Sequence, residues 1–294
     1  MKAAARLMES ALDYAGTFPP ARLDLAEALR NYARYRAGPH ASLLGRFLVP
    51  AAKLREFEET AGAALPAGGS VWPLSVIVSS EPLRDIQRSL TLGDRLEGRI
   101  RIASFEAPPL EPARVGAIAA RLPQGVEAYF EVPLGEDFEE RLAAVAAAGA
   151  SAKVRTGGLS ADVFPTAADI SRFLFACAQR GVAFKATAGL HHPFFCRRPV
   201  EGGAADEEAD MHGFLNLAAA ACFIQAGLAA PEEVTALLAE RSPEAIGLRD
   251  EALEWRGKRL GPDGIAEARQ RFFRSFGTCS FEEPIADLEG YRLL

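Results

Sequence analysis

A lysine lies in the middle of the segment VAFKATAGLHHP (182–193), which otherwise has the composition of a short buried strand, and two histidines follow it. Burying an ammonium group is costly unless another group pairs with it or a reaction uses it. Only five of the 33 lysines and arginines are lysine, so a lysine on a strand is unusual for this chain. Lysine can lose its proton and form an imine, whereas arginine cannot. Lys185 is therefore the first candidate for a catalytic nucleophile.

Further charged side chains are predicted on the same face of neighbouring strands. Successive strand residues point to opposite faces, so the apolar Val154 places Lys153 and Arg155 on the other face of their strand. The same alternation in EAYFEVP, RIASFEA and VAFKATAG predicts further polar side chains that point into the barrel. The predicted cluster consists of Glu106, Glu131, Lys153, Arg155, Lys185 and Thr187. We expect Glu106 and Thr187 to bind substrate.

This cluster indicates imine chemistry on a carbonyl compound. A lysine held among other cations has a lowered pKa and becomes nucleophilic, and we expect Lys153 and Arg155 to have this effect on Lys185. Glu131 would act as general acid and base, and Arg155 would hold an anionic group. The alternative is a buried ion network without a catalytic role. Burying several charges costs several kcal/mol before pairing offsets it, so a site for an anionic substrate explains the cluster better.

Two glycines and two arginines near the cluster are further candidates for anion binding. In RTGGLS, Gly157 and Gly158 let backbone N–H groups approach a ligand. A plain glycine turn after a strand explains this pair equally well. Arg197 and Arg198 could clamp a carboxylate or a phosphate, although such a pair is more often simply exposed.

A long connection follows the strand that carries Lys185. It runs from His191 and His192 to a helix that carries His212, and connections of this length in a barrel are usually functional. We expect these histidines to bind substrate or to transfer protons. Together with Cys196 they also form a donor set for zinc or iron, so a metal ion stays open as an alternative to a site without cofactors. Cys279 is disfavoured as a nucleophile because no histidine lies near it in the sequence.

Short apolar strands alternate with helical segments after residue 44, which predicts a parallel sheet with right-handed crossovers. We expect strands at 45–50, 74–80, 99–107, 127–133, 151–157, 182–189, 245–250 and 276–281. Eight such units predict an α/β fold of the (β/α)₈ TIM-barrel type. An open doubly wound sheet is disfavoured because LVPAAKL lacks the glycine fingerprint typical of that fold.

The chain is expected to form one domain over residues 1–294. Residues 1–38 are predicted to form two extra helices with a turn at TFPP, and residues 45–294 to form the barrel. The even spacing of the units leaves no linker between domains. Catalytic groups of such barrels lie at the C-terminal ends of the strands, where the charged cluster is expected.

The composition argues against several classes of protein. The net charge of −6 and the pI near 5.4 disfavour a nucleic-acid partner, which would need a basic face. No run approaches the roughly 20 apolar residues of a membrane span, and the N-terminus lacks the apolar core of a signal peptide. The four cysteines form no CxxC pair, which fits reduced thiols in the cytoplasm. The sequence leaves open whether the chain forms a homo-oligomer.

Several motifs along nearly the whole chain resemble those of an uncharacterised family of bacterial proteins. These motifs are DYAGTFPPARL, LLGRFLVPAAKL, KVRTGG, FKATAGLHHP, MHGFLN and FGTCSFEEP. This resemblance implies common ancestry and brings no activity with it. The short motif FKATAG also resembles the strand that carries the Schiff-base lysine of deoxyribose-phosphate aldolases, although the second lysine here lies on the preceding strand.

The sequence thus predicts a barrel enzyme with lyase or aldolase chemistry on a small anionic metabolite that carries a carbonyl group. Lys185 would form the imine, with Lys153 as the neighbour that lowers its pKa. One alternative is a transferase that resembles quinolinate-type phosphoribosyltransferases, in which a basic barrel mouth holds a phosphorylated sugar. The other alternative is a ligand-binding barrel without catalysis.

Overall fold

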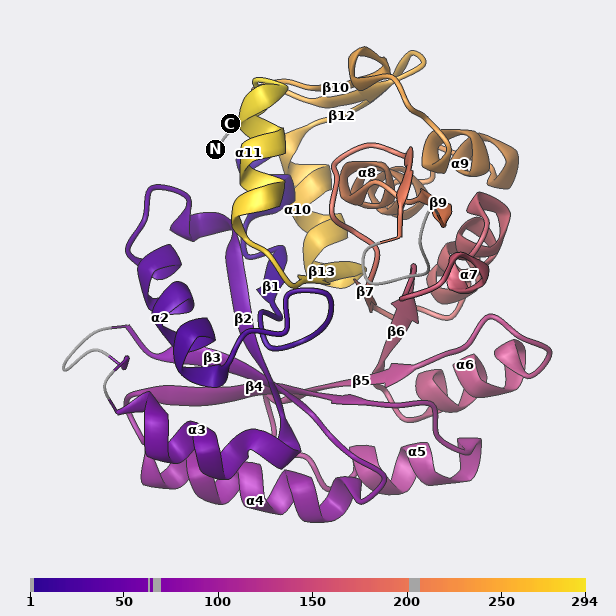
Figure 1. Cartoon of the computed structure of the whole chain (residues 1–294). Helices are drawn as coiled ribbons and strands as arrows, with labels where there is room; N and C mark the ends of the chain where they lie inside the picture. The colour runs from indigo at the N-terminus through magenta and orange to yellow at the C-terminus, as the bar shows by residue number, and fades with distance from the viewer. Residues whose placement is uncertain (1–2, 63, 66–69, 201–206) are drawn as a thin grey trace.

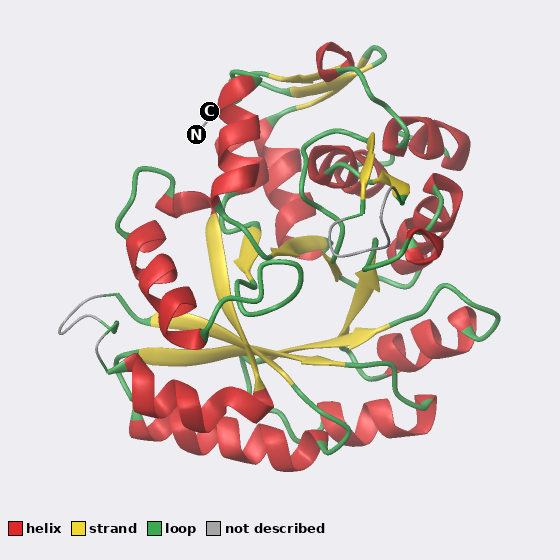
Figure 2. Cartoon of the chain, in the orientation of Figure 1, coloured by secondary structure: helices red, strands yellow, loops and turns green. Residues whose placement is uncertain are grey.

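The computed structural model describes residues 3–62, 64–65, 70–200 and 207–294. Its centre is a closed barrel of parallel strands in the order β1-β13-β7-β6-β5-β4-β3-β2. Helices surround the strands, as Figures 1 and 2 show. The predicted (β/α)₈ fold is confirmed.

The eight barrel strands are short and mostly buried. They are β1 Leu12–Tyr14, β2 Leu44–Pro50, β3 Trp72–Ile77, β4 Ile100–Ala107, β5 Glu127–Glu131, β6 Ser151–Arg155, β7 Phe184–Thr187 and β13 Phe273–Thr278. Apolar side chains on one face of each strand pack against the helices, while the other face points into the barrel. Val154 and Ala186, for example, are fully buried on the helix side.

The helices begin at residues that favour helix starts. They are α1 Ala3–Met8, α2 Leu25–Arg36, α3 Leu54–Ala61, α4 Pro82–Arg95, α5 Pro112–Ala119, α6 Phe138–Ala147, α7 Ala167–Gln179, α8 Phe214–Gln225, α9 Pro231–Leu238, α10 Pro262–Arg271 and α11 Glu282–Gly290. Asp24 caps α2 by accepting the backbone N–H of Glu27 at 2.6 Å, and Thr166 forms a capping box with Asp169 at the start of α7. No helix among the described residues has the length and apolar character to cross a bilayer.

The first barrel strand lies in the segment that was expected to be a helical extension. Strand β1 separates α1 from α2 and joins β13 on one side and β2 on the other. The two predicted helices exist, but α2 is the helix of the first strand-helix unit and not an addition outside the barrel. A strand of three residues is too short to show a period of two, and this is why the sequence pattern missed it.

The expected strand at 245–250 does not belong to the barrel. Its residues form β10 (Ile246–Leu248), which pairs antiparallel with β11 (Leu253–Trp255), and β11 pairs with β12 (Lys258–Leu260). Figure 1 shows this small sheet beside α11. The last barrel strand was expected at 276–281 but begins at Phe273, directly after α10.

The long connection after β7 forms structure of its own. Strands β8 (Cys196–Pro199) and β9 (Glu208–Met211) pair antiparallel within it, and α8 follows. Helix α8 is buried on nearly all sides, which is typical of a helix enclosed by other elements. The connection therefore leaves the barrel, turns back along β8 and β9, and returns to the outer layer of helices.

Candidate functional site

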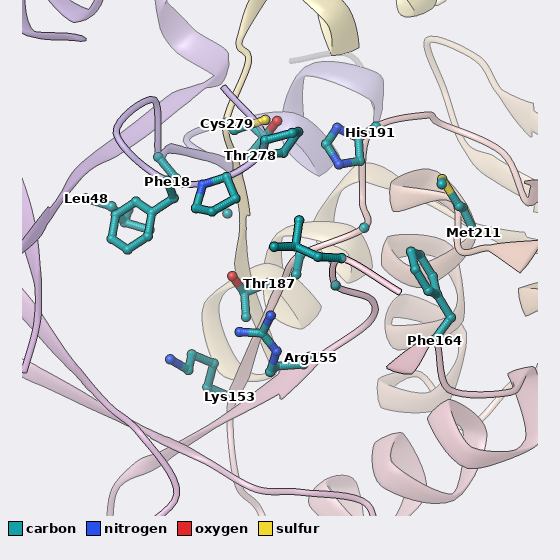
Figure 3. Close-up of a pocket in the computed structure, with 18 of the residues that line it drawn as sticks. Phe18, Leu48, Lys153, Arg155, Phe164, Thr187, His191, Met211, Thr278 and Cys279 are labelled. Carbon is teal, nitrogen blue, oxygen red and sulfur yellow. The ribbon is translucent and has the colours of Figure 1, made fainter. Parts of the chain in front are cut away.

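A cavity of about 610 Å³ lies at the C-terminal ends of the barrel strands. This volume is in the range of sites for small molecules. Glu131, Arg155 and Thr187 each end their strand and line the cavity, together with Glu106 and Lys153. Figure 3 shows Lys153, Arg155 and Thr187 close together at one side of it.

Neighbouring strands bring the predicted charged residues into register. Lys153 pairs with Glu131 across β5 and β6, and with Lys185 across β6 and β7. All three side chains are on the face expected from strand parity, and Glu106 joins them from β4. The four side chains therefore approach one another from neighbouring strands, but Lys185 does not reach the cavity as expected.

Lys185 lies beneath the cavity. Its side chain is fully buried, and Lys185 is not among the described residues that line the cavity. Its Nζ donates to Asp13 Oδ2 at 2.7 Å and to Glu106 Oε1 at 2.5 Å. The ammonium group is thus enclosed by two carboxylates and does not face a space that could hold a substrate.

Serine hydroxyls complete the hydrogen bonds of the two carboxylates. Ser75 donates to Glu106 Oε1 at 2.8 Å, and Ser104 donates in turn to Ser75 at 2.8 Å. Ser275 donates to Asp13 Oδ2 at 2.6 Å. Buried charges are stabilised when their hydrogen-bonding capacity is satisfied in this way.

The pKa of Lys185 is raised, which corrects the expectation that nearby cations lower it. Burial alone would lower this pKa, but Asp13 and Glu106 outweigh that effect. For both carboxylates burial raises the pKa, while the ammonium group of Lys185 holds it below the usual range. Lys185 therefore stays protonated and is a structural cation at neutral pH.

Lys153 occupies the position that was expected for the nucleophile. Its Nζ lies 3.2 Å from Glu131 Oε2 and 3.7 Å from Glu106 Oε2, and its side chain is 7% exposed. Unlike Lys185, it lines the cavity. Lys153 thus combines an amine at the floor of the cavity with a carboxylate that can exchange protons with it.

Arg155 and the following glycines have separate roles. Arg155 is exposed and lines the cavity, and within the described ranges it forms no ion pair with a carboxylate. Its guanidinium is therefore available to an anionic ligand. A Cβ atom on Gly157 would lie 2.5 Å from the ring of Phe164, so Gly157 permits close packing. Gly158 lines the cavity.

Two of the three predicted histidines reach the cavity. His191 and His192 line it, with Nδ1 of each near a carboxylate of α11, at 3.2 Å from Glu283 and at 2.8 Å from Asp287. His212 lies elsewhere and is almost fully buried; its Nε2 is 2.8 Å from the carbonyl oxygen of Pro165.

A metal site is not supported by the arrangement of the ligand-type residues. Within the part of the chain that the structure describes, no three His, Cys, Asp or Glu side chains are placed to hold a metal ion together. His191 and His192 have carboxylate partners on α11, whereas His212 bonds to the backbone. The donor set suggested by the sequence, which also included Cys196, is therefore divided among different places.

Two groups of the site were not predicted from the sequence. Asp13 is the partner that the buried Lys185 requires, and its place between the apolar Leu12 and Tyr14 was a weak signal of a strand. Cys279 was set aside for lack of a histidine, yet it lines the same cavity as His191 and lies near it (Figure 3). Neither contact involves residues close in sequence.

Comparisons with family models, with curated proteins and with solved structures found no match for this chain. The chemistry of the cavity itself is therefore the basis for a proposal about function.

Proposed function

We propose that the protein is a barrel enzyme of the lyase type, which forms an imine between Lys153 and a small anionic carbonyl compound. The observation that carries the proposal is the position of Lys153 at the cavity floor, 3.2 Å from Glu131. The proposal keeps the chemistry predicted from the sequence and assigns the imine to Lys153, because Lys185 is enclosed by carboxylates.

In the proposed reaction, Lys153 passes a proton to Glu131, and its nitrogen forms a bond to the carbonyl carbon of the substrate. Glu131 returns protons to the carbonyl oxygen, which leaves as water, and the imine forms. The protonated imine then accepts the electron pair of the bond that breaks at the α carbon. Glu106 and Lys185 hold Lys153 in place from below.

Two arginines at the cavity favour a substrate with a negative charge. Arg155 lines the cavity next to Lys153, and Arg198 lines it from the connection after β7. Guanidinium groups bind carboxylate and phosphate through paired hydrogen bonds. A compound with an acidic group at one end and a carbonyl group at the other fits this distribution of charge.

The test is to trap the imine with borohydride after incubating the protein with pyruvate or with hydroxyacetone, a neutral compound of similar size. We expect a stable adduct on the peptide that contains Lys153, identified by mass spectrometry. Arg155→Gln should lower labelling by pyruvate about tenfold, since a hydrogen bond to a charged group is lost, and should leave labelling by hydroxyacetone unchanged.

The control variants are Lys153→Arg, which should give no adduct, and Lys258→Arg, which should behave as the wild type. Lys258 pairs with Glu233 and does not line the cavity. An adduct on Lys185 would identify Lys185 as the residue that forms the imine and would contradict the proposal. No adduct with either compound would also contradict it, and stabilisation by pyruvate without trapping would then favour a binding barrel.

A further inference from the structure

Three side chains from separate segments meet on the wall of the cavity. Cys279 directly follows β13, Glu283 lies in the first turn of α11, and His191 lies in the connection after β7. All three line the cavity. Figure 3 shows Cys279 and His191 along the same edge of it, on the side away from Lys153.

His191 lies beside the other two residues. Its Nδ1 is 3.2 Å from Glu283 Oε2, and Cys279 lies near it on the same edge of the cavity (Figure 3). Burial alone would lower the pKa of His191, but its neighbours Cys279 and Glu283 raise it to about 10. A thiol, an imidazole and a carboxylate in this order are the groups of an activated cysteine nucleophile.

We propose that Cys279, His191 and Glu283 form a second nucleophilic site in the cavity, which adds to aldehydes independently of Lys153. Cys279 reacts as a thiolate beside the protonated imidazole of His191, and Glu283 orients that ring. The sulfur then bonds to the carbonyl carbon, the π bond to oxygen breaks, and the oxygen takes the proton from His191. The product is a thiohemiacetal, and its formation needs no other reactant.

The four cysteines provide an internal comparison for this proposal. Cys279 and Cys196 are both partly exposed, whereas Cys177 and Cys222 are buried. Burial raises the pKa of Cys196 in spite of its contact with Arg198. Among the residues that the structure describes, Cys196 has no imidazole partner, and it therefore serves as the reference thiol.

The first test measures the rate at which iodoacetamide alkylates each cysteine of the reduced, folded protein between about pH 6 and pH 9. Because the thiolate is the reactive form, we expect Cys279 to react at least about tenfold faster than Cys196 near pH 6.5. Equal rates for Cys279 and Cys196 over the whole pH range would overturn the proposal. This comparison uses the wild-type chain and does not depend on the folding of a variant.

Two histidine variants separate the proposed role from a general effect of removing an imidazole. His191→Asn should slow alkylation of Cys279 about tenfold at neutral pH, because the cation that stabilises the thiolate is lost. His40→Asn is the matched control and should leave the rate unchanged, since His40 pairs with Glu289 and is not among the residues that line the cavity. Equal effects of the two substitutions would contradict the assignment to His191.

The second test separates this site from the imine proposed above. In Lys153→Met, propionaldehyde should slow alkylation of Cys279 and leave Cys196 unaffected. Protection in this variant supports addition at Cys279 even if no imine is trapped in the wild type. If propionaldehyde does not protect Cys279, addition to aldehydes is excluded, whatever the outcome at Lys153.

Discussion

Lys153 and Lys185 are neighbours in register on adjacent strands, but they differ in depth. Lys185 is fully buried between Asp13 and Glu106, whereas Lys153 reaches the cavity. A buried ammonium group with two carboxylates is held in its charged form, and its removal takes from both carboxylates their closest cation. We therefore expect Lys185 to act on the stability of the barrel and Lys153 to act on the reaction.

The substitution Lys185→Met should lower the free energy of unfolding by about 3–5 kcal/mol, since it removes the cation closest to two buried carboxylates. Adding Asp13→Asn should recover part of this loss, because Glu106 keeps an ion pair with Lys153. Urea denaturation measures both variants. Arg55→Gln, which removes an exposed ion pair with Glu59, should cause only a small loss of stability, because exposed ion pairs contribute little. A loss of that small size for Lys185→Met would contradict the structural role.

At the scale of elements, the turn after β7 positions the first residues of the long connection. Ala188 and Gly189 both have a positive φ, of 63° and 72°. The turn is tied to the preceding unit, because Thr156 donates its hydroxyl to the carbonyl oxygen of Ala188 at 2.5 Å. Two residues in the left-handed region redirect the chain so that His191 and His192 reach the cavity.

We expect Gly189→Ala to destabilise the protein more than Gly181→Ala does. Both glycines have a positive φ, so an added Cβ costs about 1–2 kcal/mol of backbone strain at each. At Gly189 the Cβ would also lie 3.0 Å from Phe164 and from the carbonyl oxygen of Thr156, whereas at Gly181 it meets open space. Thermal unfolding of the two variants measures the difference. Equal shifts in Tm would show that the contacts around Gly189 have no energetic role.

At the scale of the whole molecule, the ion network joins strands that are distant around the barrel. Asp13 lies on β1, Lys185 on β7 and Glu106 on β4, and the three side chains meet in the interior. The network therefore links strands that are not adjacent in the barrel, in addition to the hydrogen bonds between adjacent strands. A change in the protonation of these three groups therefore changes the stability of the whole barrel.

The network predicts how the stability of the protein depends on pH. The pKa values of Asp13 and Glu106 are lower in the folded than in the unfolded chain, so their contribution is present above about pH 4.5 and is lost as the pH falls through the folded values. The pKa of Lys185 is raised, so its contribution to stability depends on pH in the opposite direction. This contribution is lost only above about pH 10.5.

Urea denaturation at a series of pH values tests this dependence. We expect the wild type to lose stability steeply below about pH 4.5, and the double variant Asp13→Asn with Lys185→Met to show a shallower loss. Parallel curves for the two proteins below that pH would mean that other carboxylates dominate the acid transition.

The sequence by itself determined the features that depend on neighbours along the chain. The alternation of apolar strands with helices indicated the barrel, and the apolar Val154 and Ala186 indicated which way the adjacent lysines point. These predictions succeeded because a strand has a period of two and its apolar face must be buried. The charged cluster was predictable for the same reason, since parallel strands end at the same side of the sheet.

Only the tertiary structure decided which charged groups meet and how deep each one lies. Asp13 and Lys185 are separated by 172 positions, and Cys279 meets His191 only when α11 packs beside the connection after β7. Local periodicity defines the face of a strand, but the depth of a side chain depends on the register of its strand within the closed barrel. That register places Lys185 beneath the cavity and Lys153 at its floor, which the sequence pattern of two similar strands could not distinguish.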